Sequence, residues 1–129
     1  MAHVLLIDDD REMVEANRIA LEAGGYRVSV AYTGQEAWNL LEKASPDIVV
    51  LDVMMEEFTS GFEVAHDMGI KYSQIPIIML TGVREYMHGD WRYSVENDQK
   101  WLPIHRFLEK PVTPSRLCEE IASILYATP

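Results

Sequence analysis

The sequence predicts an α/β domain: a doubly wound, five-stranded parallel sheet with helices on both faces. Short, continuous apolar runs mark strands that are buried on both faces, as in parallel sheets. Amphipathic helical patterns alternate with these runs, which favours right-handed crossover connections. With 129 residues, 48% of them apolar, the chain can enclose one core, and we expect a single domain over residues 1–129.

The first predicted elements are a strand and a helix. Val4–Ile7 is a continuous apolar run. Asp10 can cap a helix that runs to Ala23, because its side chain can accept hydrogen bonds from the free N–H groups of the first turn. Gly24 and Gly25 then end that helix.

The second strand and helix follow directly. Tyr26–Ala31 is half alternating, so this strand is expected near an edge of the sheet. Thr33 and Glu36 have the spacing of a capping box at a helix start. The apolar face of that helix consists of Ala37, Leu40, Leu41 and Ala44. Ile48–Leu51 is the third apolar run and the third strand.

The alternation continues beyond the third strand. Ser60 and Glu63 repeat the capping-box spacing and predict a third helix near residues 61–69. Ile75–Leu80 is the fourth strand, with Pro76 near its start because proline cannot donate a ladder hydrogen bond.

The last predicted elements are a short strand and a helix. Arg106–Leu108 is the fifth and shortest strand. Thr113, followed by Pro114 at the first helical position, begins the final helix. Its inward-facing residues are Leu117, Ile121, Ile124 and Leu125.

Composition argues against several functions. A net charge of −10 argues against direct nucleic-acid binding, which depends on Lys and Arg that neutralise phosphates. No run reaches the roughly 20 apolar residues that span a bilayer, and no signal peptide is visible. One cysteine, Cys118, excludes an internal disulfide, so we expect a cytoplasmic protein without membrane contact. Four histidines without metal-ligand spacing are expected at the surface: His3, His66, His88 and His105.

Polar residues follow four of the apolar runs, and the carboxyl ends of parallel strands gather at one ligand-binding edge. Three carboxylates there would repel one another unless a cation neutralised them, and oxygen ligands suit Mg²⁺. An ammonium and a hydroxyl beside that ion make a place for phosphoryl oxygens. The pattern therefore predicts a phosphoryl acceptor site with an aspartate as the acceptor. Its residues are Asp8, Asp9, Asp52, Thr81 and Lys110.

The chain resembles the receiver domains of two-component response regulators, which have the CheY-like, flavodoxin-like fold. The matching stretches are VLLIDDD, PDIVVLDVMM, IPIIMLTG and FLEKPV, in that order, and the resemblance covers essentially the whole chain. It implies that a sensor histidine kinase or a phosphotransfer protein donates a phosphoryl group to Asp52. The domain would catalyse only its own phosphorylation and dephosphorylation. It would act as a switch on an unknown downstream protein and not as an enzyme on external substrates.

The resemblance also implies a Mg²⁺ site. Asp9 and Asp52 would bind the ion directly, together with the backbone carbonyl of Met54. Asp8 would act through a coordinated water.

The remaining roles concern the phosphoryl group and the switch. Lys110 would pair with Asp52 and then with the phosphoryl group, and its bond to Pro111 is typically cis in this family. Thr81 would hydrogen-bond a phosphoryl oxygen and move inward. Phe107 stands at the position of the family's switch aromatic.

The chain departs from the family pattern in two segments. The loop after Asp52 is acidic and lacks the usual proline, and the segment from Thr81 to Lys110 is longer than expected. The fourth-helix region, residues 83–103, is therefore atypical. Its aromatic residues either pack over the core or form a partner surface: Trp91, Tyr93 and Trp101.

Two apolar residues are expected to tune the lifetime of the phosphorylated state. In receivers, the side chains two positions after the acceptor and two after the threonine flank the path of the hydrolytic water. Here these are Met54 and Val83, which cannot orient that water, so we expect slow hydrolysis.

Three other functions compete with this prediction. A haloacid-dehalogenase-like phosphatase would need a second acid where Met54 stands. An FMN-binding flavodoxin would need a Ser/Thr/Gly-rich loop where residues 8–10 are acidic. A degenerate receiver, which acts as a phosphorylation-independent interaction module, would have lost an acidic, Thr or Lys position; none is lost, and this stays the main alternative. Whether the chain is a stand-alone regulator or a piece of a longer one stays open.

Overall fold

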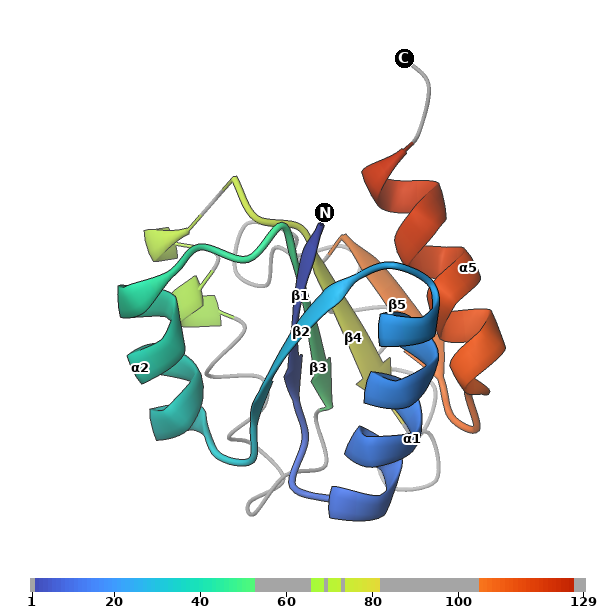
Figure 1. Ribbon diagram of the computed structural model, residues 1–129. Helices are drawn as coiled ribbons and strands as arrows, with labels where there is room; N and C mark the ends of the chain where they lie inside the picture. Colours follow the sequence, from blue (N-terminus) through green and yellow to red (C-terminus); the bar gives the residue numbers. More distant parts are fainter. Residues whose placement is uncertain (1, 53–65, 69, 73, 82–104, 127–129) are drawn as a thin grey trace, which may run out of the picture.

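The computed structural model describes residues 2–52, 66–68, 70–72, 74–81 and 105–126. Within this part of the chain, five parallel strands form one sheet in the order β2-β1-β3-β4-β5 (Figure 1). The strands are β1 His3–Ile7, β2 Arg27–Ala31, β3 Ile48–Asp52, β4 Ile77–Thr81 and β5 Arg106–Glu109. The labelled helices are α1 Arg11–Ala23, α2 Gly34–Lys43 and α5 Pro114–Leu125. The predicted doubly wound sheet is confirmed, and β2 lies at an edge as expected.

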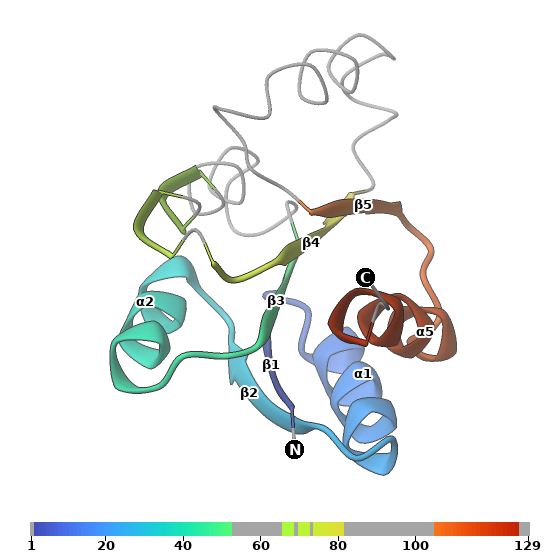
Figure 2. The ribbon, with the colours of Figure 1, turned by 90° about the horizontal axis from the view of Figure 1, so that it is seen from above.

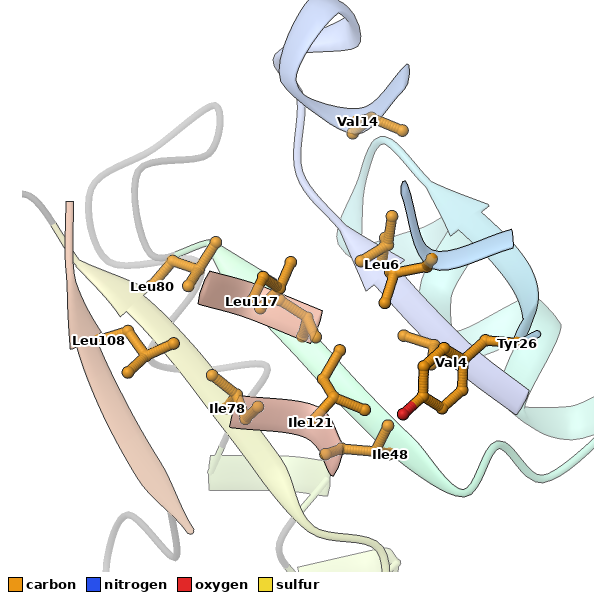
Figure 3. Close-up of a cluster of buried hydrophobic side chains, with 12 residues drawn as sticks. Val4, Leu6, Val14, Tyr26, Ile48, Ile78, Leu80, Leu108, Leu117 and Ile121 are labelled. Atoms are coloured by element: carbon orange, nitrogen blue, oxygen red, sulfur yellow. The ribbon is translucent and has the colours of Figure 1, made fainter. Parts of the chain in front are cut away.

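Side chains of the central strands alternate between two buried clusters, one on each face of the sheet. Leu5 and Ile7 of β1 belong to the first cluster, whereas Val4 and Leu6 belong to the second. This alternation is the two-residue period of a pleated strand. Every residue of β1 and β3 is buried, and both faces of these strands are apolar except at His3 and Asp52. Figure 3 shows part of the second cluster, in which residues of α5 meet the sheet.

Helices cover both faces of the sheet (Figure 2). Helices α1 and α5 pack side by side on one face, and α2 lies on the other. The helical residues 66–68 and 70–71 lie on the α2 side, where Met68 joins Ala37 and Leu41 in the first cluster. The sheet thus lies between two layers of helices.

Three predicted helix caps are confirmed. The Asp10 side chain accepts hydrogen bonds from two N–H groups of the first turn of α1, at 3.1 and 3.2 Å. Thr33 accepts one from the N–H of Glu36 at the start of α2 (3.1 Å). Thr113 does the same for α5 at 3.0 Å, and Pro114 takes the first helical position. Helices α1 and α5 thus begin a few residues after β1 and β5, close to the polar residues that follow these strands.

Some predicted boundaries were wrong. Ala44 is not on the buried face of α2: it is the exposed C-terminal cap, with extended backbone. The third helix, predicted to end near residue 69, continues to Lys71. Strand β4 begins at Ile77, after Pro76, whose carbonyl accepts a hydrogen bond from the N–H of Val49 (3.0 Å).

His3 was also predicted wrongly. It is buried in β1, with 8% of its surface exposed, and does not lie at the surface. Its Nε2 lies 2.7 Å from Ser29 Oγ on the neighbouring strand. A partner on an adjacent strand, which the local sequence does not reveal, makes this burial possible.

Several predictions lie outside the described residues. They are the helix start at Ser60, the loop after Asp52 and the region of residues 83–103 with its three aromatic side chains. Among the residues that the structure does describe, no helix combines the length and the apolar character needed to cross a membrane.

Candidate functional site

The site begins where β1 and β3 end. Ile7 of β1 is paired with Leu51 of β3, so the next residue of each strand, Asp8 and Asp52, lies at the same level of neighbouring strands. The strand order reverses between these two strands, since β1 leads to β2 on one side and β3 lies on the other. In open α/β sheets, ligands bind outside the carboxyl ends of the strands at such a switch point. The two carboxylates thus lie where open α/β sheets typically bind their ligands.

Strands β4 and β5 add the remaining strand ends. Thr81 ends β4 and is paired with Glu109, the last residue of β5. Lys110 follows immediately, so the predicted polar residues of all four strand ends share one edge of the sheet. Phe107 lies in β5, half-buried against the first cluster. The contacts predicted for Thr81 and Phe107 after phosphorylation stay predictions.

An ion pair forms the centre of the site. Lys110 Nζ donates a hydrogen bond to Asp52 Oδ2, as predicted. Asp52 is 2% exposed, whereas the Lys110 side chain is partly open to solvent. The Lys110–Pro111 peptide bond is cis, as the family resemblance implied. A buried carboxylate needs a partner of opposite charge, and this lysine supplies it.

Asp8 is the second buried carboxyl group, with 6% of its surface exposed. Its Oδ1 accepts a hydrogen bond from the N–H of Asp10 (2.9 Å), and its own N–H donates to the carbonyl of Ala31 (3.0 Å). Burial, followed by the charge of Asp52 and a side-chain hydrogen bond to it, raises the pKa of Asp8 to about 7. The Asp10 N–H and the Lys110 ammonium oppose this shift of the pKa. The Lys110 ammonium therefore interacts with the carboxyl groups of both Asp8 and Asp52.

The donor set fits a hard cation. Asp8 and Asp52 offer carboxylate oxygens, which Mg²⁺ prefers, and their mutual repulsion is what a cation would relieve. Asp9 is exposed beside them. Over the described residues, no group of three or more His, Cys, Asp or Glu side chains is placed to hold a metal ion together. Asp9 therefore does not form one metal-binding group with Asp8 and Asp52 in this structure. The carbonyl of Met54 lies outside the described residues, so the complete set of Mg²⁺ ligands stays a prediction.

The sequence reasoning missed Asn17, a polar residue that lies close to the site. It is in α1, is 4% exposed, and lines a small cavity together with Asp8. Helical spacing could have revealed it. Val14 and Leu21 are buried on the same face of α1, three residues before and four after Asn17, so the core-facing period includes this amide.

A model of a known protein family matches most of the chain. The model described as response regulator receiver domain matches residues 4–122. This span includes the acidic strand ends, Thr81 and Lys110.

Comparisons with individual proteins agree. Response regulator SaeR of Staphylococcus aureus (strain USA300) is 31% identical over 125 residues, which are 97% of this chain and 51% of that protein. The chain thus spans about half the length of the curated relatives that it matches. The chemotaxis response regulator CheY4 of Vibrio cholerae has a similar structure, with 30% identity, a TM-score of 0.78 and coverage of 97% and 99% of the two chains. A CheY-like receiver domain from Methanospirillum hungatei JF-1 shares the fold, with 24% identity, a TM-score of 0.82 and coverage of 98% and 94%.

Proposed function

The chain belongs to the response regulator receiver domains, and from this we propose that it is a phosphorylation-dependent signalling switch in which Asp52 accepts the phosphoryl group. One observation carries the proposal. The buried Asp52 is paired with Lys110 and lies beside the buried Asp8, at the switch point of the sheet. A buried carboxylate that is held at a ligand-binding edge by one partly open lysine is poised to react with an anionic substrate.

The donor in this proposal is a sensor histidine kinase or a phosphotransfer protein. An oxygen of the Asp52 carboxylate forms a bond to phosphorus, in line with the leaving group, while the P–N bond of the donor phosphohistidine breaks. The imidazole leaves with the bonding electron pair. Lys110 stays beside Asp52 and neutralises negative charge on the transferred group.

Mg²⁺ is part of the proposed reaction. Asp9, Asp52 and the carbonyl of Met54 would hold the ion directly, and Asp8 would hold it through a water. When bound, it would neutralise charge on the phosphoryl oxygens. The raised pKa of Asp8 supports this assignment, because a carboxyl group that retains its proton near pH 7 through burial and repulsion is one that a cation would ionise.

Phosphorylation changes the charge at the strand ends. The acyl phosphate carries roughly −1.5 to −2 charge in place of the single charge of the Asp52 carboxylate, and it brings new acceptor oxygens next to Thr81 and Lys110. We propose that Thr81 bonds one of these oxygens and that Phe107 responds, which changes the surface offered to a downstream protein.

The reaction stays within the chain: it catalyses only its own phosphorylation and dephosphorylation and acts on no external substrate. Cys118 offers no rival nucleophile, since it is half-buried and its burial raises the pKa of the thiol. The net charge of −10 supports a protein partner over nucleic acid, and we place the domain in the cytoplasm with its kinase.

The test is treatment with a small acyl phosphate and Mg²⁺, followed by intact mass. We expect the parent to gain one phosphoryl group and Asp52→Asn to gain none. Asp67→Asn is the matched control, because Asp67 is exposed and far along the chain from the strand ends. If the parent gains nothing with Mg²⁺ present, the degenerate receiver becomes the better assignment. If Asp52→Asn gains as much as the parent, another residue is the acceptor.

Calorimetric titration with Mg²⁺ tests the metal assignment separately. Asp9→Ala should weaken binding severely, because it would remove a direct ligand. Unchanged affinity in that variant would remove Asp9 from the ligand set.

A further inference from the structure

Asn17 is an unusual residue for the place it occupies. It lies on the buried face of α1, whose neighbouring inward residues, Val14 and Leu21, are apolar. Its side chain is more than nine-tenths buried, and its Oδ1 has no hydrogen-bond partner in the described part of the protein. A buried amide oxygen without a partner is costly, and folded proteins usually satisfy such groups with an ordered water.

The surroundings of Asn17 provide room for such a water. A cavity of about 10 Å³ lies between α1 and the sheet. Two of its lining residues, Asn17 and Asp8, are polar, while Val14, Val50 and Leu80 are among the apolar ones. This volume is about what a single water needs, and the two polar groups give it partners.

We propose that Asn17 is a positioning residue for Asp8, and that it acts through one water bound in this cavity. The water donates one hydrogen to Asn17 Oδ1 and the other to the Asp8 carboxylate. Asp8 already accepts the N–H of Asp10 on Oδ1, so the water gives this carboxyl group a second, interior donor. Two donors fix its orientation toward Asp52 and favour its charged form.

The expected effect is on cation binding, and this part rests on the proposed function. Residues that orient a metal ligand through a hydrogen bond, without touching the ion, typically change the metal affinity by roughly 10–100-fold when they are removed. Asn17 would thus set how well the acidic pair binds Mg²⁺, although it does not touch the ion.

Three variants separate this role from a packing role. Asn17→Leu removes the amide and fills the cavity, and we expect its Mg²⁺ dissociation constant, measured by calorimetry, to rise about tenfold. Its melting temperature should not fall, because an apolar side chain of similar size replaces a buried amide that has no protein partner for its oxygen. Asn17→Ser retains an acceptor for the water and should stay within about threefold of the parent. Leu21→Val, on the same face of α1, should lower the melting temperature and leave Mg²⁺ affinity unchanged.

The opposite results overturn the proposal: parent-like Mg²⁺ affinity in Asn17→Leu, or an Asn17→Ser variant as weak as Asn17→Leu. A high-resolution crystal structure of the parent without Mg²⁺ gives an independent readout. It should show a water within hydrogen-bond distance of both Asn17 Oδ1 and the Asp8 carboxyl group, and its absence there would refute the bridge. A parent that binds no Mg²⁺ would instead refute the proposed function, while the crystal structure would still decide the water bridge.

Discussion

The two ends of β1 each carry one buried titratable side chain, and the two sites differ in what surrounds them. His3, at the start of the strand, shares a 2.7 Å hydrogen bond with the hydroxyl of Ser29, and its backbone N–H donates to Asp47 at the same distance. Asp8, just past the other end, lies beside a second buried carboxylate, Asp52. Burial favours the neutral form of both side chains.

The difference between the ends lies in the neighbouring groups. Burial, followed by the charge of Arg27, lowers the pKa of His3, and Nε2 of the ring shares a hydrogen bond with a neutral partner, Ser29. Burial raises the pKa of Asp8, and when Asp8 ionises beside Asp52 the two carboxylates carry more negative charge than the Lys110 ammonium balances. Burial thus leads to a structural hydrogen bond at the His3 end of the strand. At the Asp8 end it leads to excess negative charge that a bound cation would neutralise.

The largest expected effect is on stability at the Asp8 end. The folded state retains the Asp8 proton up to about pH 7, whereas an unfolded Asp releases it near 3.8. The folded state therefore binds more protons between these values, and the free energy of unfolding should fall as pH rises through that window, by on the order of 3–4 kcal/mol.

Urea unfolding at several pH values, without divalent cations, measures this loss. Asp8→Asn cannot ionise, so it should remove this part of the slope. Saturating Mg²⁺ should oppose the loss, because it binds the ionised form. An Asp8→Asn profile parallel to that of the parent would show that Asp8 is not the titrating group.

The next effect concerns the ion pair. Lys110→Met should destabilise the protein by about 3 kcal/mol at pH 8, because it removes the ammonium that neutralises the buried Asp52 carboxylate. The double variant Lys110→Met/Asp52→Asn should recover most of this loss, since it also removes the negative charge of Asp52. Chemical unfolding of both variants tests the expectation. A double variant that is no more stable than Lys110→Met would mean that the lysine acts mainly through packing.

A smaller effect is expected on the lifetime of phosphorylated Asp52. Met54→Asn should speed hydrolysis, because an amide can orient the attacking water where the thioether cannot. Met54→Asn/Val83→Glu should be faster still, by about tenfold over the parent, which corresponds to about 1.4 kcal/mol of barrier. Dephosphorylation rates at saturating Mg²⁺ give the comparison, with Ile70→Asn as an exposed apolar-to-polar control. Equal rates in parent and double variant would place control of water access elsewhere.

The sequence was sufficient to predict one end of β1 but not the other. Asp8, Asp52 and Lys110 could be assigned because parallel strands bring their carboxyl ends together, so position along the chain implies position in space. His3 could not, because its burial depends on a partner on another strand. Helical spacing places Asn17 on the buried face of α1, but the cavity that it shares with Asp8 depends on the sheet. The roles of Met54 and Val83 rest on family resemblance alone, and residues 83–103 departed from the pattern that would have predicted their structure.

The smallest expected effect is at the His3 end, and its sign is opposite to that of Asp8. Because the pKa of folded His3 lies below the ordinary 6.5, its contribution to stability is fully present above pH 6.5 and is lost as pH falls. His3→Gln retains a polar group that can reach Ser29 but does not titrate. We expect it to cost about 1 kcal/mol at pH 8, the usual net value of one hydrogen bond, and to cost less or nothing at pH 5. Urea unfolding of parent and variant at the two pH values, with Mg²⁺ saturating to suppress the Asp8 contribution, gives the difference directly. If the gap between parent and variant is the same at both pH values, His3 does not titrate in this range and the contrast between the two ends of the strand is weaker than its burial indicates.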